Sequence, residues 1–278
     1  MKYRITTLLE NKKKEDKSYY TEHGLSFVIE TPSESIIFDT GQSDAFIRNA
    51  RLMDIDLKCV NKMIISHGHY DHSGGVKPFI EKYHNNLQFF VSSHFFDKKY
   101  KIVDEISKYI GNDFNSEFLE GNGVSINLIK NSITKVSENI YVVTNFERNF
   151  LEETNEQFYI KENGKNIVDL FNDEISVVVK GEKGLVVLVG CSHPGIRNII
   201  TTVKKLFSEP ILAVIGGTHL RNASDKRIMD TIEIFKELKI KKIGVSHCTG
   251  DRAVNLLKKE MPDEFFENNT GSVFEFDK

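Results

Sequence analysis

Four short apolar runs in this chain are each followed, within a few residues, by a turn that carries histidine. The run Cys59–Ser66 leads into the segment HGHYDHSGG at residues 67–75. Runs of this length and composition are typical of buried strands. Since an open sheet presents its functional groups beyond the carboxyl ends of its strands, we expect these histidines to meet at one sheet edge. The three other runs, Leu185–Val189, Ile211–Ile215 and Lys242–Val245, lead to His193, His219 and His247.

The order of the expected elements favours two mixed sheets over one doubly wound parallel sheet. Three strand-like runs precede the first helical pattern, Ala45–Met53. After residue 175, strands and helices alternate behind a hairpin that closes at residues 181–184. This order predicts an α+β sandwich of two mixed β-sheets with helices outside. The early strands are Arg4–Leu9, Leu25–Glu30 and Ser35–Phe38, and the later helices are Ile196–Phe207, Lys226–Leu238 and Asp251–Lys259.

The middle of the chain, residues 95–173, has a less regular pattern. Polar and aromatic residues and several turn signals interrupt the apolar periodicity there. We expect strands at Gly123–Ile129 and Ile140–Thr144, and an irregular stretch from Asn145 to Asp173. No linker rich in proline, glycine or serine divides the chain, so we expect one domain over residues 1–278.

Composition limits the classes of partner. The 278 residues include 37 Lys and Arg against 40 Asp and Glu, and a net charge of -3 argues against nucleic-acid binding by charge alone. No apolar run approaches the roughly 20 residues that span a bilayer. The apolar stretch Ile5–Leu9 is too short for a signal-peptide core, and three cysteines make no disulfide framework. We therefore expect a cytoplasmic protein that acts on a small molecule, with no nucleic-acid or membrane partner.

The segment at residues 67–75 has the chemistry of a metal site. Imidazole nitrogen and carboxylate oxygen are the ligands that borderline-soft metal ions take. In a tight turn, His67 and His69 can converge on one ion, while Asp71 and His72 can serve a second. Gly68, Gly74 and Gly75 permit the tight backbone that this arrangement needs.

Taken together, these motifs resemble one known family. HGHYDHSGG is similar to the HxHxDH signature of the metallo-β-lactamase fold superfamily. GCSHPG, GGTHL and SHCTG extend the likeness over nearly the whole chain, and EHGLS, FDTG and NNTGS agree with it. The set resembles the subfamily of 7,8-dihydropterin-6-methyl-4-(β-D-ribofuranosyl)aminobenzene 5′-phosphate synthase-like proteins. The resemblance implies a four-layer αββα sandwich with metals at one edge between the sheets.

The resemblance also implies a ligand set for two divalent ions. His67, His69 and His193 would bind the first ion, and the second would be bound by Asp71, His72 and His247. His219 stands where hydrolases of the superfamily place a bridging aspartate, and imidazole bridges two metals poorly. Either His219 binds one ion only, or the second site is weak or has a different metal preference. Zinc is the expected metal, with iron and manganese as alternatives.

Other residues are expected around these ligands. Asp39 would accept a hydrogen bond from a ligand histidine, as carboxylates near metal sites do. His23 and His94 are candidates to face the substrate, and Arg148 is a candidate cation for a phosphate. Asp225 and Asp230 rank below His219 because both fall on or near an expected helix. Cys191 and Cys248 flank the ligands, and a thiolate could bind zinc, but with enough histidines present we expect them to be buried neighbours. Cys59 is expected to be a core residue.

The favoured activity is that of a metal-dependent hydrolase. A metal-activated hydroxide at a dinuclear site would attack a small phosphorylated, lactone or ester substrate, with Asp71 orienting the water and accepting its proton. The subfamily implies an alternative: condensation of a pterin methyl diphosphate with a ribosyl-aminobenzene phosphate, which releases diphosphate. A second alternative, from another class, is a sensor that binds metal and ligand without turnover.

Overall fold

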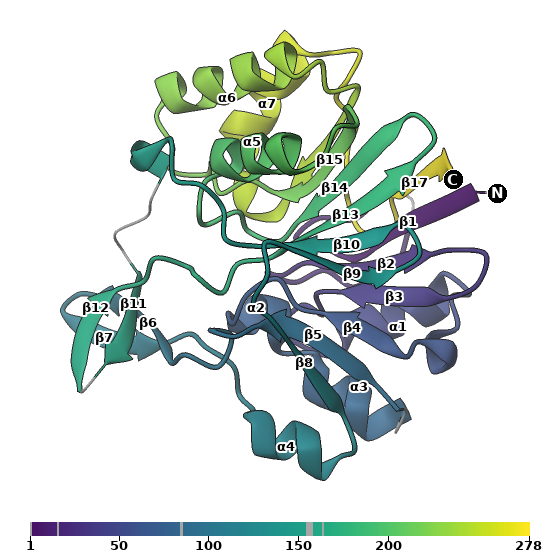
Figure 1. Cartoon of the computed structure of the whole chain (residues 1–278), viewed down its shortest axis with the longest axis vertical. Helices are drawn as coiled ribbons and strands as arrows, with labels where there is room; N and C mark the ends of the chain where they lie inside the picture. The colour runs from purple at the N-terminus through teal and green to yellow at the C-terminus, as the bar shows by residue number, and fades with distance from the viewer. Residues whose placement is uncertain (1, 16, 84–85, 154–157, 163) are drawn as a thin grey trace.

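Two β-sheets pack face to face and carry helices on their outer sides. The computed structural model describes residues 2–15, 17–83, 86–153, 158–162 and 164–278. In Figure 1 three helices cover the upper sheet and others lie beneath the lower one, which confirms the expected four-layer αββα sandwich. The upper helices are α5 (Ile196–Leu206), α6 (Asp225–Glu237) and α7 (Asp251–Glu260), and the lower ones are α1 (Ala45–Leu52), α3 (Val76–Tyr83) and α4 (Ser116–Gly121).

The lower sheet has seven strands and is mixed. Its first four strands in space pair antiparallel, and from β3 onward the pairing is parallel. Parallel pairing turns the carboxyl ends of β3, β4 and β5 to one edge. In spatial order the strands are β17 (Val273–Asp277), β1 (Lys2–Leu9), β2 (Ser26–Glu30), β3 (Ser35–Phe38), β4 (Lys62–Ile64), β5 (Gln88–Ser92) and β8 (Ser125–Ile129).

The upper sheet has six strands and is also mixed. β13 and β14 form the expected hairpin, whereas β14, β15 and β16 run parallel. The carboxyl ends of these three strands therefore lie side by side. In spatial order the strands are β16 (Lys242–Ser246), β15 (Ile211–Gly217), β14 (Gly184–Val189), β13 (Ser176–Gly181), β10 (Ile140–Val143) and β9 (Ile133–Ser137).

The valine-rich strand β13 shows how the layers hold together. Val177 and Val179 are fully buried between the two sheets, and Val178 is fully buried against the helices. Successive side chains of a strand point to opposite faces, so a strand covered on both faces reads as one continuous apolar run. Each fully buried valine contributes about 1.5–3 kcal/mol to folding. On the helix side, α5 buries Ile196, Ile199, Ile200 and Val203, which recur at helical spacing.

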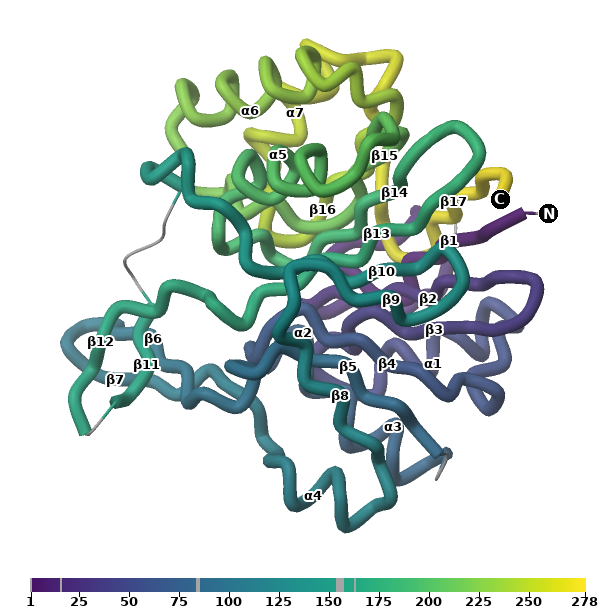
Figure 2. Tube along the Cα trace, in the orientation of Figure 1, coloured from purple at the N-terminus to yellow at the C-terminus, as the bar shows by residue number. Residues whose placement is uncertain are grey.

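A small third sheet projects from the sandwich beside the strand ends. Figure 2 shows that it joins two distant parts of the chain, since a hairpin before residue 110 pairs with one after residue 157. The expectation of an irregular stretch at residues 145–173 was wrong here. All of the described residues of β7 and β12 are exposed, so the apolar alternation that predicts a strand is missing. The order is β12 (Lys165–Val168), β11 (Phe158–Glu162), β6 (Lys99–Val103) and β7 (Ile106–Tyr109).

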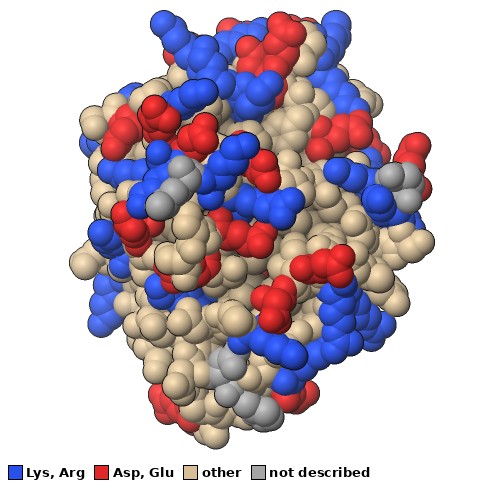
Figure 3. Space-filling view, turned by 90° about the vertical axis from the view of Figure 1, so that its right-hand side faces the viewer, with Lys and Arg blue, Asp and Glu red and all other residues tan. Residues whose placement is uncertain are grey.

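The surface carries charges of both signs. On the face shown in Figure 3, lysines and arginines are interspersed with aspartates and glutamates. This mixture fits the near-balanced composition. None of the helices in the described part of the chain is long and apolar enough to cross a membrane.

Candidate metal centre

The loop at residues 67–75, called the histidine loop below, follows β4 and is fixed by contacts with the turn after β3. The short helix α2 (Tyr70–Ser73) forms its second half. The backbone N–H and the hydroxyl of Thr40 both donate to the His72 carbonyl, at 2.8 and 2.9 Å. A Cβ at Gly75 would lie 2.5 Å from the Thr40 carbonyl oxygen, so glycine is required at this approach. Backbone contacts thus hold the loop, and its side chains point to the upper sheet.

Three buried histidines form the first cluster. Ligand nitrogens of His67, His69 and His193 lie within 4.8 Å of one another, and His67 Nε2 is 3.0 Å from His69 Nδ1. Nitrogens bound to one tetrahedral zinc lie about 3.3 Å apart. His69 Nε2 and both ring nitrogens of His193 are buried without a hydrogen-bond partner among the described residues. Burial lowers the pKa of each histidine well below 6.5, so neutral imidazoles offer lone pairs. This donor set fits a metal ion.

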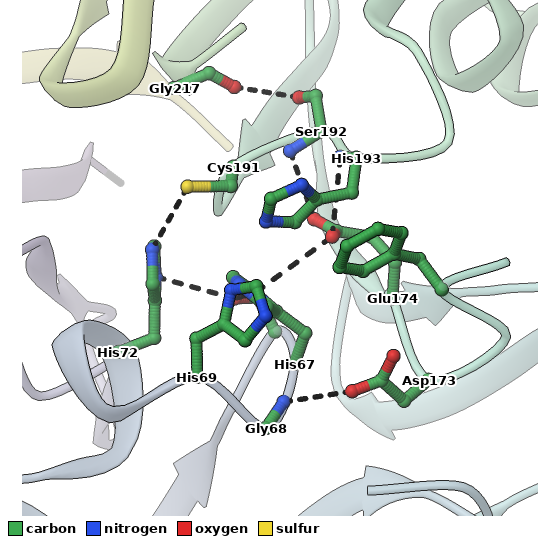
Figure 4. Close-up of polar contacts among 12 residues, drawn as sticks. His67, Gly68, His69, His72, Asp173, Glu174, Cys191, Ser192, His193 and Gly217 are labelled. Carbon is green, nitrogen blue, oxygen red and sulfur yellow. Dashed lines mark hydrogen bonds and ion pairs between the residues drawn. The ribbon is translucent and has the colours of Figure 1, made fainter. Parts of the chain in front are cut away.

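Asp39 and Ser66 orient two of the histidines. Asp39 Oδ2 accepts hydrogen bonds from the Ser66 hydroxyl at 2.8 Å and from His72 Nδ1 at 2.7 Å. With its proton used in this way, the Ser66 oxygen accepts from His67 Nδ1 at 2.9 Å. Both rings therefore turn Nε2 toward the centre (Figure 4). Burial opposes protonation of His72, but the carboxylates of Asp39 and Asp71 outweigh burial and raise its pKa to about 9.

A second cluster forms around Asp71. The Gly24 N–H donates to Asn11 Oδ1 at 3.3 Å, which fixes that amide, so Asn11 Oδ1 accepts the Nδ1 proton of His247 at 2.8 Å. His247 then presents a lone pair at Nε2 to Asp71 Oδ2, 3.4 Å away. Two facing acceptors repel each other, so this pair suits a cation. His23 Nε2 lies 3.1 Å from the same oxygen.

The upper sheet supplies its histidines from strained backbone. His219 has φ 53°, His247 has φ 54° and Ser192, beside His193, has φ 62°. Side chains with a Cβ rarely adopt this left-handed region, at a cost of about 1–3 kcal/mol each. The ring of His219 is 4.5 Å from the ring of His193, so β14 and β15 deliver histidines to one place. The strain coincides with the candidate ligands, which indicates a functional site.

The two clusters share one cavity of about 210 Å³. Asp71, His219 and His247 line its sandwich side. Phe158 of β11 and Lys101 of β6 line the side formed by the small sheet. Arg221 also lines the cavity, and its guanidinium donates a hydrogen bond to the His247 carbonyl at 3.1 Å. Two cations and an aromatic ring suit an anion that carries an apolar group.

A buried ion-pair network, not anticipated from the sequence, supports the histidine loop. Lys99 Nζ lies 2.6 Å from Asp169 and 2.8 Å from Asp173, and all three side chains are buried. Asp173 also accepts the Gly68 N–H at 2.8 Å. Burial opposes the charge of Lys99, but Asp173 and Asp169 outweigh it and raise its pKa. The network connects β6 of the small sheet to the loop, and Phe171 stacks on His193 beside it at 3.9 Å.

Two glutamates, also not anticipated, hold the strand ends. Glu174 accepts hydrogen bonds from the N–H groups of Ser192 at 3.0 Å and His193 at 3.4 Å. Burial and the charge of Asp173 raise the pKa of Glu174 to about 8. Glu10 accepts from the His247 N–H at 2.7 Å. For Glu174, the sequence signal was a pair of adjacent acids directly before the valine-rich strand β13, since acids are seldom buried without partners.

Several residues singled out from the sequence lie away from the cavity. His94 is exposed and pairs with a neighbouring aspartate. Arg148 donates to the Leu170 carbonyl and lines a separate cavity behind the site. Asp225 and Asp230 lie in α6 and pair with surface cations. The expectation that Cys59 is a core residue was wrong, because this cysteine is exposed.

Sequence and structure comparisons agree with this description. Residues 19–125 match the family model of the metallo-beta-lactamase superfamily. The chain is 30% identical, over 98% of its length and 96% of the relative, to 7,8-dihydropterin-6-methyl-4-(beta-D-ribofuranosyl)-aminobenzene-5'-phosphate synthase of Methanocaldococcus jannaschii. The fold, the motifs and this full-length relative show that the chain belongs to the metallo-beta-lactamase superfamily, which confirms the resemblance read from its motifs.

Solved structures give the same result. Tm1679, described as a metal-dependent hydrolase of the beta-lactamase superfamily, is 32% identical to this chain, with a TM-score of 0.87 over 99% of this chain and all of that one. Zinc-bound PqqB from Methylobacterium extorquens has a TM-score of 0.54 over 98% and 99% of the two chains. At 7% identity the latter likeness shows the fold alone.

Proposed function

We propose that this protein is a metal-dependent hydrolase of a small phosphorylated substrate. The observation that carries the proposal is the facing pair of acceptors, His247 Nε2 and Asp71 Oδ2, in the same cavity as three neutral histidines. These groups lose their hydration on burial, and a cation compensates for that loss.

The proposed ligands divide between two divalent ions, with zinc as the favoured metal. His67, His69 and His193 would hold the first, because their nitrogens converge and are neutral. The second ion would be held by the carboxylate of Asp71 with the Nε2 atoms of His72 and His247, and its binding would release the Nε2 proton of His72. When bound, such ions polarise a phosphoryl oxygen and lower the pKa of coordinated water to about 7.

Residues of this chain then supply binding and proton transfer. Burial raises the pKa of Asp71, but His72 and His23 outweigh burial and lower this pKa well below its ordinary value, so Asp71 stays ionised and can orient a nucleophile. Lys101 and Arg221 lie where they can bind the phosphate oxygens of a substrate in the cavity. Phe158 offers an apolar contact to the remainder of the substrate.

A pterin-related synthase is the second candidate. The relative from Methanocaldococcus jannaschii that bears such a name is similar to this chain over its full length. In that reaction Lys101 and Arg221 would bind the departing diphosphate. The nucleophile would be a ribosyl-aminobenzene phosphate instead of water. Phe158 is the aromatic ring available to contact a pterin.

The first experiment is the metal content of protein purified without added metal or chelator. About two ions per chain would support both reactions. One ion per chain would shift the proposal to a mononuclear enzyme, and no bound metal even after reconstitution would overturn it.

The second experiment separates the two reactions. A pterin methyl diphosphate is incubated with the metal-loaded protein, with and without a ribosyl-aminobenzene phosphate. Release of phosphate or diphosphate without the acceptor supports hydrolysis. Release that requires the acceptor, with formation of the joined product, supports the synthase. Turnover of simple phosphoesters but not of the pterin compound would retain the hydrolase and exclude this substrate.

A further inference from the structure

Two buried cysteines, Cys191 and Cys248, lie next to the proposed metal ligands but are not among the ligands assigned above to the two ions. Cys191 follows β14, and Cys248 lies in the short 3-10 helix η3 (His247–Thr249) that follows β16. Cys191 is 4% and Cys248 7% exposed. Their sulfurs and a ring nitrogen of the half-buried His219 all lie within 4.8 Å of one another. Three neighbouring parallel strands therefore each place one donor at the same point.

Cys191 also contacts the histidine loop. Its Sγ is 3.2 Å from His72 Nε2, as Figure 4 shows. With His67 and His72 it forms another triad of ligand atoms that lie within 4.8 Å of one another. The sulfur of Cys191 is thus common to two triads, one with donors from the loop and one with donors from the upper sheet.

Two backbone groups define the surroundings of Cys248 Sγ: the N–H of His219, which points at the sulfur, and Gly217, which has no side chain to occupy the space beside it. The His219 N–H donates to this sulfur at 3.3 Å. The same sulfur lies 3.4 Å from the carbonyl oxygen of Cys191, so the two cysteines are in direct contact. A Cβ at Gly217 would lie 2.6 Å from the same sulfur, so glycine keeps this space open.

We propose that Cys191 and Cys248 are thiolate ligands of the metal centre. Together with His219, they would take the place of the bridging aspartate that hydrolases of the superfamily have at this position. Cys191 lies between His67 and His72 of the loop and the donors of the upper sheet, His219 and Cys248. Imidazole bridges two ions poorly, whereas the sulfur of Cys191 faces both groups of donors. Thiolate ligands favour zinc over magnesium or manganese. The inference rests on the metal centre of the proposed function, but not on its substrate or reaction.

X-ray absorption at the zinc edge tests the proposal on protein loaded with two zinc ions per chain. We expect a zinc–sulfur shell at about 2.3 Å beside the nitrogen and oxygen shell at about 2.0–2.2 Å. The double variant Cys191→Ser/Cys248→Ser should lose the sulfur shell. Cys59→Ser is the matched control, since this exposed cysteine lies outside the cavity, and it should keep the shell.

The wild-type spectrum gives an answer even if the double variant does not fold. Zinc bound entirely by nitrogen and oxygen would overturn the sulfur ligation and leave the metal-dependent hydrolase standing. Failure to bind zinc would overturn both. Cobalt loading gives a second readout, because a thiolate-to-cobalt absorption band in the near ultraviolet should weaken in each single variant and stay unchanged in Cys59→Ser.

Discussion

The two walls of the cavity are built differently. The sandwich wall consists of buried side chains whose orientation is set by hydrogen bonds, as in the chain from Asp39 through Ser66 to His67. The wall formed by the small sheet comes from β6 and β11, which among their described residues bury Lys99 alone. Burial restricts the geometry of the first wall, whereas the second has few contacts that do so. From this difference we expect that the sandwich wall carries the chemistry and that the small sheet shapes access and substrate choice.

The strongest test of this division removes a ligand from the sandwich wall. For His67→Ala we expect a loss of activity of about 10³-fold or more, because metal ions supply several kcal/mol of transition-state stabilisation. Metal content should fall by about one ion per chain, measured by elemental analysis. His94→Ala is the control, since His94 is exposed and outside the cavity. Equal losses in both variants would contradict the ligand assignment.

The next test breaks the buried network that joins the two walls. Lys99→Met leaves Asp169 and Asp173 buried without their cation, so we expect the free energy of unfolding to fall by about 3–5 kcal/mol. Urea denaturation measures the change. Lys98→Met, at the exposed neighbouring position, should change stability by less than about 0.5 kcal/mol. A loss below about 1 kcal/mol for Lys99→Met would show that the network is not structural.

A smaller effect is expected where an orienting group is altered but the ligands remain. Asp39→Asn keeps the shape of the side chain and weakens the hold on His72 Nδ1, so metal affinity should fall about 10–100-fold. Competition with a chelator measures the affinity. Asp104→Asn, in the exposed turn between β6 and β7, should leave it unchanged. Unchanged affinity for Asp39→Asn would mean that Ser66 alone orients the loop.

The smallest effect is expected on the small sheet. Lys101→Ala should raise KM about tenfold with little change in kcat, because a single charge-assisted hydrogen bond to substrate is worth about 1.5 kcal/mol. Lys108→Ala is the matched control, since Lys108 is the cross-strand partner of Lys101 in β7 and does not line the cavity. A fall in kcat with unchanged KM would mean that Lys101 takes part in the chemical step. That result would contradict the proposal that only the sandwich wall carries the chemistry.

Most of the sandwich could be predicted because its strands and helices carry their own periodicity. The hairpin of β13 and β14 and the helix α5 were expected within a residue or two of their observed ends. In the small sheet, β7 and β12 were missed because strands exposed on both faces need no apolar alternation. The sheet as a whole is defined by the pairing of β6 with β11, which joins two hairpins about 50 residues apart. The terminal strand β17 was missed as well, although it pairs with β1.

The sequence by itself determined which donors are present and where each stands relative to a strand end. In the sequence-based prediction and in the structure alike, the candidate ligands follow strands, because a local pattern suffices to place a turn after a strand. These ligands are His67 to His72, His193, His219 and His247. Only the tertiary structure decided which groups meet. Glu174 reaches the backbone of His193, Glu10 that of His247, and Cys191 the ring of His72, over separations of 19, 237 and 119 residues. Such contacts depend on the packing of two sheets, and no local pattern specifies them.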